Sequence, residues 1–262
     1  MKKMKTYDFN AEKTFSLLKY QWLIWAESNG FSEKKWVVGI SGGKDSTVTA
    51  ALAARIFGRE NVVGVLMPCG EQPDISDAEE AVQILGIKRV RVNIGKSFAD
   101  ITGQFESPEN SLEVSEDSKI NLPARLRMST LYAVAQSVDG IVLNTSNLTE
   151  NYLSFMTLYG DHAGSYGPIQ NLTVTEVIKL GEWLGLPEKL VWKTPVDGLQ
   201  PLTDEEKLGM RYYNVDEFIR YGRLFVDPEK IYEKYCSGKF KLEIVNIPGP
   251  TFDFPDYVKR DF

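Results

Sequence analysis

Residues 41–46 read Ser-Gly-Gly-Lys-Asp-Ser, a run that combines the residue types needed to hold phosphate groups. Glycines let the backbone close around a phosphate, and the amides at the start of a helix donate hydrogen bonds to its oxygens. An apolar, β-branched segment precedes the run and an alanine-rich segment follows it, and α/β sheets bind their ligands at such positions. The sequence therefore predicts a phosphate-binding turn between a strand and a helix.

The spacing distinguishes this turn from two commoner phosphate-binding motifs. GxxxxGK[ST] needs Ser or Thr directly after the lysine, whereas Asp45 follows Lys44 here, and the run is not GxGxxG either. A simpler alternative is an ordinary strand-to-helix turn in which Asp45 is a capping residue. Because SGGxDS is expected by chance in roughly one of a few thousand chains of this length, we favour a functional turn.

Strands and helices alternate along the chain around this turn. The pattern predicts strands at residues 36–40, 61–68, 89–94 and 140–145, and helices at residues 9–30, 47–58, 76–86, 124–138, 173–185 and 228–236. This alternation predicts an α/β, Rossmann-like fold, a doubly wound parallel sheet with helices on both faces. We expect one domain over residues 1–221, with residues 222–262 as a helical and extended tail of the same domain.

Two polar stretches interrupt the alternation. Residues 103–121 are too long for a simple connection, so we expect a lid, a partner-contact element or a mobile loop. Residues 194–209 are expected to form an irregular loop.

Composition excludes several other classes of protein. The 262 residues carry a net charge of −6 and no block of consecutive Lys or Arg, so no broad basic surface for nucleic acid is expected. Cys69 and Cys236 are the only cysteines and His162 is the only histidine, which argues against a disulfide scaffold and against zinc. No stretch approaches the roughly 20 apolar residues of a membrane span, and we expect a cytoplasmic protein.

A second polar segment is predicted to meet the first at the carboxyl edge of the sheet. Residues 144–150 read NTSNLTE and follow the fourth predicted strand, so Thr145 and Glu150 would lie at the same edge as Asp45. Two carboxylates there could share a magnesium ion. The alternative for Glu150 is a first-turn carboxylate that interacts with the dipole of the following helix.

Taken together, these segments carry a resemblance to a known family. SGGKDS is typical of the PP-loop ATP pyrophosphatases, whose fold is adenine nucleotide alpha hydrolase-like. Together with NLPARLRM (121–128), NTSNLTE, TLYGD (157–161), KTPVDGL (193–199) and TDEEKLG (203–209), in this order, it resembles the ammonia-dependent NAD synthetase family over about residues 15–220.

The resemblance implies roles for individual residues. ATP would contact Gly39, Ile40, Ser41, Gly42, Gly43, Lys44, Asp45, Ser46, Met67 and Thr145. Asp45 and Glu150 would hold magnesium and serve catalysis, and Arg125 would contact the nicotinate dinucleotide.

The resemblance also implies a reaction. ATP would adenylate the nicotinate carboxylate of deamido-NAD, and ammonia would displace AMP to give NAD; free ammonia or a separate donor protein would supply the nitrogen. A homodimer is implied, with the acceptor near the interface, and residues 131–138 offer an apolar face for it. No nucleic acid or membrane partner is implied.

The chain departs from the family pattern at the acceptor site. Leu158 and Val174 stand where the family has lysines, and Ser165 stands where it has an aspartate. We therefore expect weaker or altered recognition of deamido-NAD, unless Arg125, Arg127 or a lysine within residues 237–242 supplies the missing cation. The alternatives are an enzyme acting on another carboxylate nucleotide such as nicotinate mononucleotide, a tRNA-modifying PP-loop enzyme, and a nucleotide sensor without turnover.

Two further side chains, Cys69 and His162, are of types that can take part in catalysis. Cys69 follows a strand and could act in sulfur transfer, but a lone cysteine there is more often a small buried hydrophobe. His162 follows TLYGD without an evident Ser or Cys partner, so a structural role is favoured over general-base catalysis.

Overall fold

The computed structural model describes residues 8–72, 75–193, 203–223 and 228–255. At its centre is a four-stranded parallel sheet with the order β3-β2-β1-β4. The strands are β1 (Lys35–Gly39), β2 (Val62–Leu66), β3 (Lys88–Arg91) and β4 (Gly140–Val142). The chain first builds the sheet outward from β1 to β3 and then returns to add β4 on the other side of β1. The carboxyl ends of β1 and β4 therefore flank the point where the strand order reverses, the usual ligand site of such sheets.

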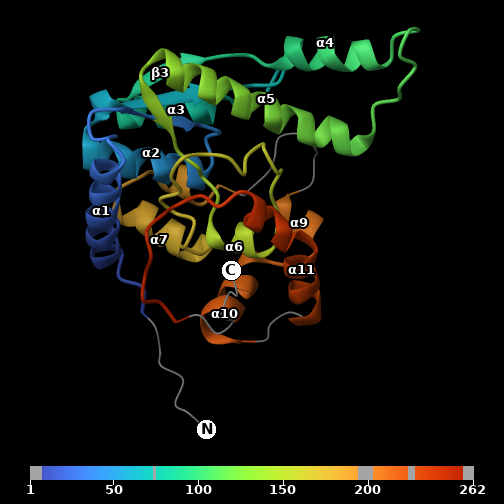
Figure 1. The fold of residues 1–262 in the computed structure, drawn as a ribbon. Coiled ribbons are helices and arrows are strands. Elements are labelled where there is room, and N and C mark those ends of the chain that lie inside the picture. The colour runs from blue at the N-terminus through green and yellow to red at the C-terminus, as the bar shows by residue number, and fades with distance from the viewer. Residues whose placement is uncertain (1–7, 73–74, 194–202, 224–227, 256–262) are drawn as a thin grey trace.

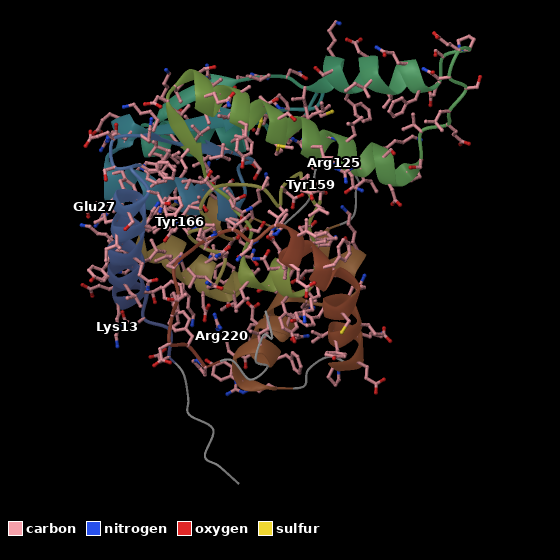
Figure 2. The ribbon with its side chains drawn as sticks, in the orientation of Figure 1. Lys13, Glu27, Arg125, Tyr159, Tyr166 and Arg220 are labelled. Carbon is pink, nitrogen blue, oxygen red and sulfur yellow. The ribbon has the colours of Figure 1, made fainter. Side chains whose placement is uncertain are left out.

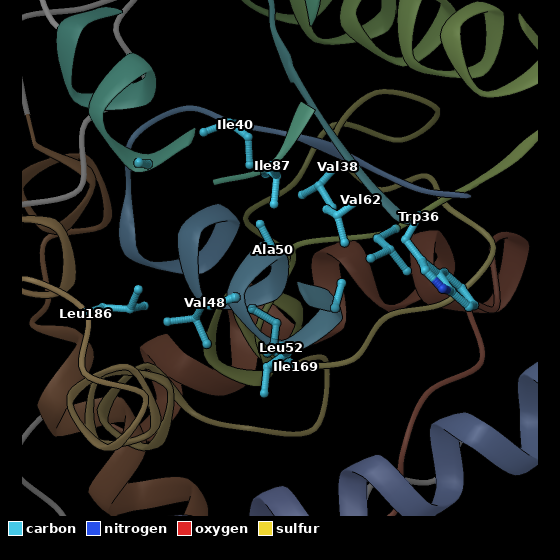
Figure 3. Packing of buried hydrophobic residues seen from close by; sticks show 14 of the residues in the cluster. Trp36, Val38, Ile40, Val48, Ala50, Leu52, Val62, Ile87, Ile169 and Leu186 are labelled. Carbon is cyan, nitrogen blue, oxygen red and sulfur yellow. The ribbon is translucent and has the colours of Figure 1, made fainter. Parts of the chain in front are cut away.

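Helices cover both faces of the sheet, as the alternation predicted. One face carries α1 (Ala11–Ser28), α2 (Lys44–Phe57), α3 (Ile75–Leu85), α7 (Val174–Trp183) and α8 (Glu188–Val191), and the short helix η1 (Arg59–Asn61) leads into β2. The other face carries α5 (Glu116–Ser137), beside which lies α4 (Gly95–Phe105). Successive residues of β1 point to opposite cores: Trp36 and Val38 pack with α1 and α2, whereas Val37 packs with α5. Figure 3 shows the larger core.

A smaller helical layer lies next to the carboxyl edge of the sheet. It consists of α6 (Leu148–Tyr152), α9 (Asp204–Leu208), α10 (Tyr212–Tyr221) and α11 (Pro228–Ile244), which share a separate hydrophobic cluster. Arg220 and Glu176 form a buried ion pair between α10 and α7, with an Nη2 to Oε2 distance of 2.8 Å. This layer is held to the rest of the chain by both apolar and ionic contacts.

Residues 245–255, which we term the C-terminal strap, run back across the molecule to α1 (Figure 1). Gly167 N donates to Pro248 O at 2.8 Å, and Asn171 Nδ2 donates to Pro250 O at 2.8 Å. Thr251 exchanges two hydrogen bonds with the side chain of Gln21 on α1. The strap has no regular secondary structure, in agreement with the extended tail predicted from its prolines.

The structure differs from the sequence prediction in the region after β3. The expected polar stretch 103–121 is shorter, because α4 extends to Phe105 and α5 begins at Glu116, before Pro123. The two helices project from the body as an arm (Figure 1). The helix α10 was not predicted, and α11 is longer than expected. The segment 194–202 of the expected irregular loop lies outside the described residues, and α9 occupies part of the remainder.

Within the described part of the chain, no helix has the length and apolar character required to cross a lipid bilayer.

Candidate functional site

The SGGKDS turn connects β1 to α2 and is shaped by its own side chains. Gly42 has φ = +80°, and a Cβ atom there would lie 2.6 Å from the backbone N of Ala78 on α3. Gly43 is the N-cap of α2 and provides no side-chain cap. The hydroxyls of Ser46 and Thr47 both donate to the carbonyl of Gly43. The amides at the start of α2 thus face the turn, an arrangement suited to binding phosphate.

Lys44 and Asp45 form an ion pair inside this turn. Lys44 is 4% exposed, its Nζ lies 2.8 Å from Asp45 Oδ2, and it also lies 5.7 Å from the ring centroid of Tyr212. Burial disfavours the charged form of Lys44, but the carboxylates of Asp45 and Glu150 outweigh that effect and raise the pKa of the ammonium group. Lys44 therefore remains a fixed positive charge beside the phosphate-binding turn.

Asn147 connects the turn to Glu150. Its Nδ2 donates to Asp45 Oδ1 at 3.0 Å, and its Oδ1 accepts from Glu150 N at 3.0 Å. Glu150 Oε2 in turn accepts from Asn147 N at 3.3 Å, which completes a capping box at the start of α6. Glu150 therefore has the first-turn position that we considered as an alternative, and it also faces Asp45.

The proximity of these carboxylates changes the acidity of Glu150. Burial, together with the negative charge of Asp45, raises the pKa of Glu150 to about 8, and Lys44 and the amide of Asn147 offset only part of this rise. A divalent cation would relieve the repulsion between the two carboxylates. Among the described residues, no group of three or more His, Cys, Asp or Glu side chains could hold a metal. The two carboxylates beside the phosphate-binding turn fit magnesium, which commonly takes one or two carboxylates and completes its shell with phosphate and water.

One cavity of about 610 Å³ contains most of the residues predicted from the sequence. It is lined by Gly39, Ile40, Ser41, Gly43, Lys44, Asp45, Ser46, Met67, Thr145 and Glu150. Gly42 is not among the lining residues, because it packs against α3. The volume lies within the range of small-molecule sites, roughly 300–1,000 Å³.

The predicted acceptor residues do not line this cavity. Arg125 is exposed on α5, where its Nε donates to Leu158 O at 3.3 Å (Figure 2). Ser165 pairs with the edge of β4 through its backbone, since its N donates to Val142 O at 2.8 Å. Val174 is 6% exposed and belongs to the hydrophobic cluster of the helical layer. Val174 therefore supplies no cation to the cavity.

Other charged residues line the cavity; of these, Arg127 and a lysine within residues 237–242 were named from the sequence as possible cations, whereas Asp161 was given no role. Arg127 lies two residues beyond Arg125, and its Nε donates to Met67 O at 3.1 Å. Asp161, the last residue of TLYGD, lines the cavity, and Thr157 N donates to its Oδ1 at 2.8 Å. Lys241 reaches the cavity from α11. Asn147 was also missed, although the spacing Asn-x-x-Glu indicates a capping box.

Cys69 and His162 lie outside the lining of the cavity. Cys69 is half-buried and packs against the core under α5. His162 is buried, and its Nε2 lies 3.0 Å from Val245 O at the start of the strap. Burial lowers the pKa of His162, so it is neutral at pH 7. Both positions agree with structural roles.

Comparison with known sequences shows which proteins share this arrangement. Residues 24–246 match the NAD synthase family. The NH(3)-dependent NAD(+) synthetase of Thermococcus kodakarensis is 37% identical over 248 residues, which are 92% of each chain. The protein of the same name from Pyrococcus horikoshii is 41% identical over 186 residues, which are 70% of each chain.

Solved structures show the same relationship. NMN synthetase from Francisella tularensis superimposes with a TM-score of 0.80 and 28% identity, over 97% of this chain and 100% of that one. The NH3-dependent NAD synthetase from Campylobacter jejuni superimposes with a TM-score of 0.68 and 25% identity, over 89% and 96%. By sequence and by structure, this chain belongs to the NAD synthase family.

Proposed function

We propose that this protein is an ATP-dependent, amide-forming ligase that converts deamido-NAD and ammonia to NAD, with AMP and pyrophosphate as the other products. The observation that carries the proposal is the cavity in which the SGGKDS turn, Asp45 and Glu150 come together. Membership of the NAD synthase family and the similarity to NH(3)-dependent NAD(+) synthetases support the same reaction. We place the reaction in the cytoplasm, where the free cysteines remain reduced.

The reaction has two steps. An oxygen of the nicotinate carboxylate attacks the α-phosphorus of ATP, the bond to the β-phosphate oxygen breaks, and pyrophosphate leaves. Ammonia then attacks the carbonyl carbon of the acyl adenylate, AMP leaves with the electrons of the broken C–O bond, and a proton is released. Adenylation is needed because a free carboxylate resists attack by an amine.

The turn and Lys44 stabilise the charge of the first step. Amides at the start of α2 would donate to the β- and γ-phosphates, and the buried Lys44 would add a fixed positive charge beside them. Asp45 and Glu150 would hold magnesium, which when bound neutralises charge on the phosphates. Asn147 keeps both carboxylates in position through its side chain.

The position of ATP cleavage tests this proposal directly. The purified protein is incubated with ATP, magnesium, ammonium and deamido-NAD, and the products are identified by mass. We expect AMP, pyrophosphate and NAD in equal amounts. ADP and inorganic phosphate as the primary products would contradict the assignment.

Amidation of nicotinate mononucleotide is a second candidate, favoured by one observation. The chain superimposes on the NMN synthetase of Francisella tularensis over its full length, with a higher TM-score than on the NAD synthetase of Campylobacter jejuni. Leu158 and Val174 also lack the charges that the resemblance predicts for a dinucleotide pocket. Comparing kcat/KM for deamido-NAD and nicotinate mononucleotide decides between the two acceptors.

We further propose that the arm formed by α4 and α5 contacts a second copy of the chain. α5 has 22 residues, but only Pro123 and Ala135 are buried, and no residue of α4 is buried. The apolar run 131–138, expected to offer an interface face, instead turns Leu131, Val134, Ala135 and Val138 to the sheet. Tyr132 remains exposed on α5 and could contribute to the contact. Light scattering during gel filtration should give twice the mass of the chain; a monomer at concentrations that retain full activity would contradict this.

A further inference from the structure

Lys241 enters the cavity because α11 packs very closely against the segment that follows α6. The rings of Tyr152 and Tyr235 stack with centroids 4.9 Å apart. Gly238 lies against Ser154, and a Cβ atom at position 238 would come within 2.0 Å of Ser154 Cβ. Residues 238 and 241 share one face of the helix, since they are three positions apart. The close approach at Gly238 therefore directs the Lys241 side chain toward the cavity.

The ammonium group of Lys241 is held only by neutral groups. Its Nζ donates to Met156 O at 2.8 Å and to Ser154 O at 3.1 Å, which uses two of its three N–H bonds. In the described part of the chain, no carboxylate lies within 4.0 Å of it. A partly buried ammonium group with no ion-pair partner within 4.0 Å is costly, so an anion that enters the cavity would be bound favourably.

Another part of the cavity, the phosphate-binding turn with Asp45 and Glu150, is already assigned to ATP and magnesium. The nicotinate carboxylate must lie near Asp45 and Glu150 to be adenylated. The remaining anionic group of a nicotinate nucleotide is the phosphate on its ribose, and Lys241 is a cation of the same cavity that does not belong to the phosphate-binding turn.

The alternative sources of a cation are less suitable. Leu158 and Val174 carry no charge, and Arg125 lies outside the cavity. Lys193 and Lys207 also line the cavity, but Lys193 forms an ion pair with Asp77 of α3 at 2.6 Å, and Lys207 already interacts with another group. Arg127 lines the cavity next to Met67, where the resemblance places the adenine of ATP. Residues 237–242 contain two lysines, Lys239 and Lys241, and of these Lys241 lines the cavity.

We propose that Lys241 binds the ribose phosphate of the nicotinate nucleotide and replaces the cation that is absent at position 158. This rests on the proposed function, because it assumes that the acceptor is a nicotinate nucleotide. Both candidate acceptors carry this phosphate, so the role of Lys241 is the same for each.

Three substitutions separate the charge of Lys241 from its hydrogen bonds. Lys241→Gln keeps an NH2 donor for the two carbonyls but removes the charge, and Lys241→Arg keeps the charge. Lys234→Gln is the matched control, since Lys234 is exposed on the same helix. For each protein, calorimetry gives the dissociation constants of nicotinate mononucleotide, deamido-NAD and nicotinate riboside, which lacks the phosphate, and steady-state kinetics give KM for ATP.

We expect Lys241→Gln to weaken binding of the phosphate-bearing acceptor by about tenfold to hundredfold, the effect of a lost charged hydrogen bond. Binding of the riboside and KM for ATP should change less than threefold, Lys241→Arg should retain most of the affinity, and Lys234→Gln should match the unaltered protein. Equal losses for the riboside and the mononucleotide would show that Lys241 only supports residues 154–156, and unchanged binding would also overturn the proposal. If the unaltered protein forms no AMP with any nicotinate nucleotide, the proposed function itself fails, and with it the role of Lys241.

Discussion

Asn147 has two roles at the site, because it belongs both to a helix cap and to the carboxylate pair. Its side chain accepts from the first turn of α6 and donates to Asp45 on a different element. The residue is completely buried, so neither bond can be replaced by bulk water. The separation of Asp45 and Glu150 therefore depends on one amide.

Asn147→Ala should lower kcat strongly and stability moderately. Loss of an N-cap costs about 0.5–2 kcal/mol, and the freed Asp45 carboxylate should lower kcat at least tenfold at ordinary magnesium. Asn10→Ala is the control, because Asn10 caps α1 in the same way, with its Oδ1 2.8 Å from Lys13 N, but lies away from the cavity. Chemical denaturation and steady-state kinetics measure both effects. Equal kcat values in the two variants would show that Asn147 is only a cap.

The acidity of Glu150 predicts an unusual pH dependence of stability. Its pKa is about 8 in the folded protein against 4.5 without the fold, so the folded state binds the additional proton between these values. Stability therefore falls as pH rises through this window. Glu150→Gln keeps an acceptor for the capping box but has no carboxyl group to titrate, so its stability should not fall as pH rises through this window. Without magnesium, the free energy of unfolding of the variant at pH 8.5 should exceed that of the unaltered protein by on the order of 1–3 kcal/mol. Each kcal/mol corresponds to about 2–4 °C in melting temperature. Near pH 4.5 the two proteins should differ little.

Glu206→Gln is the control for this measurement. Glu206 occupies the same position in the capping box of α9, but hydrogen bonds from Thr203 lower the pKa of this exposed carboxyl. Its contribution is present above the unfolded pKa and is lost as pH falls, so this variant should gain nothing at pH 8.5. A gain in both variants would point to a general effect of removing negative charge.

At the scale of elements, the phosphate-binding turn is constrained by its contact with α3. Gly42→Ala places a Cβ atom 2.6 Å from a backbone nitrogen at φ = +80°, so the turn must move. We expect affinity for ATP to fall at least tenfold and stability to fall by about 1–3 kcal/mol. Gly30→Ala is the matched control, because Gly30 has φ = +72° but no atom within 4 Å of the added Cβ. Equilibrium dialysis with ATP distinguishes them, and equal affinities would contradict the proposed contact.

The sequence could identify elements more reliably than it could orient them. The strands β1 and β2 and the turn after β1 were predicted because their signals are local, an apolar β-branched run followed by glycines. The helix α5 was also predicted, but Arg125 and Arg127 differ by about 200° around its axis. α5 has mixed polarity along its length and buries few residues, so the sequence did not reveal which arginine faces the cavity.

Within the arm, residues 103–121 were predicted as a loop and the start of α4 was not predicted as a helix. α4 contains glycines at positions 95 and 103, which lower helix propensity, and this masked the helical spacing of Phe98, Ile101 and Phe105. Pro123 suggested that α5 begins after it, since proline removes a backbone donor and is unfavourable in a helix interior. In the structure the helix continues through Pro123, which is itself buried.

At the scale of the whole molecule, the site depends on contacts between residues that are far apart in the sequence. Asp45 and Asn147 are 102 residues apart, and Lys241 and Ser154 are 87 residues apart. The sequence predicted that the two segments of the first contact share an edge, because the carboxyl ends of parallel strands lie together, but it did not identify Asn147. The second was not, because it depends on how α11 packs, which a single sequence does not specify.

Arg220 joins three parts of the molecule and provides a test of how they depend on each other. It pairs with Glu176 of α7, donates to Asn171 O at 2.9 Å and lies 5.2 Å from the ring of Phe254 in the strap. Arg220→Met leaves a buried carboxylate unpaired, so we expect the free energy of unfolding to fall by about 3–5 kcal/mol. The double variant Glu176→Leu, Arg220→Met should recover part of this loss. A single variant within 1 kcal/mol of the unaltered protein would contradict this.

The position of α11 and the strap also has a consequence for how the enzyme is made. The phosphate-binding turn, β1–β4 and α6 all precede residue 153 in the chain, whereas Lys241 and the strap are more than 80 residues later. A ribosome synthesises the chain from its N-terminus, so an ATP-binding core can fold before the residue that we assign to the acceptor has been added. A nascent or prematurely terminated chain would therefore bind ATP but lack the Lys241 contact to the acceptor. It would form no product until α11 has been synthesised and has packed.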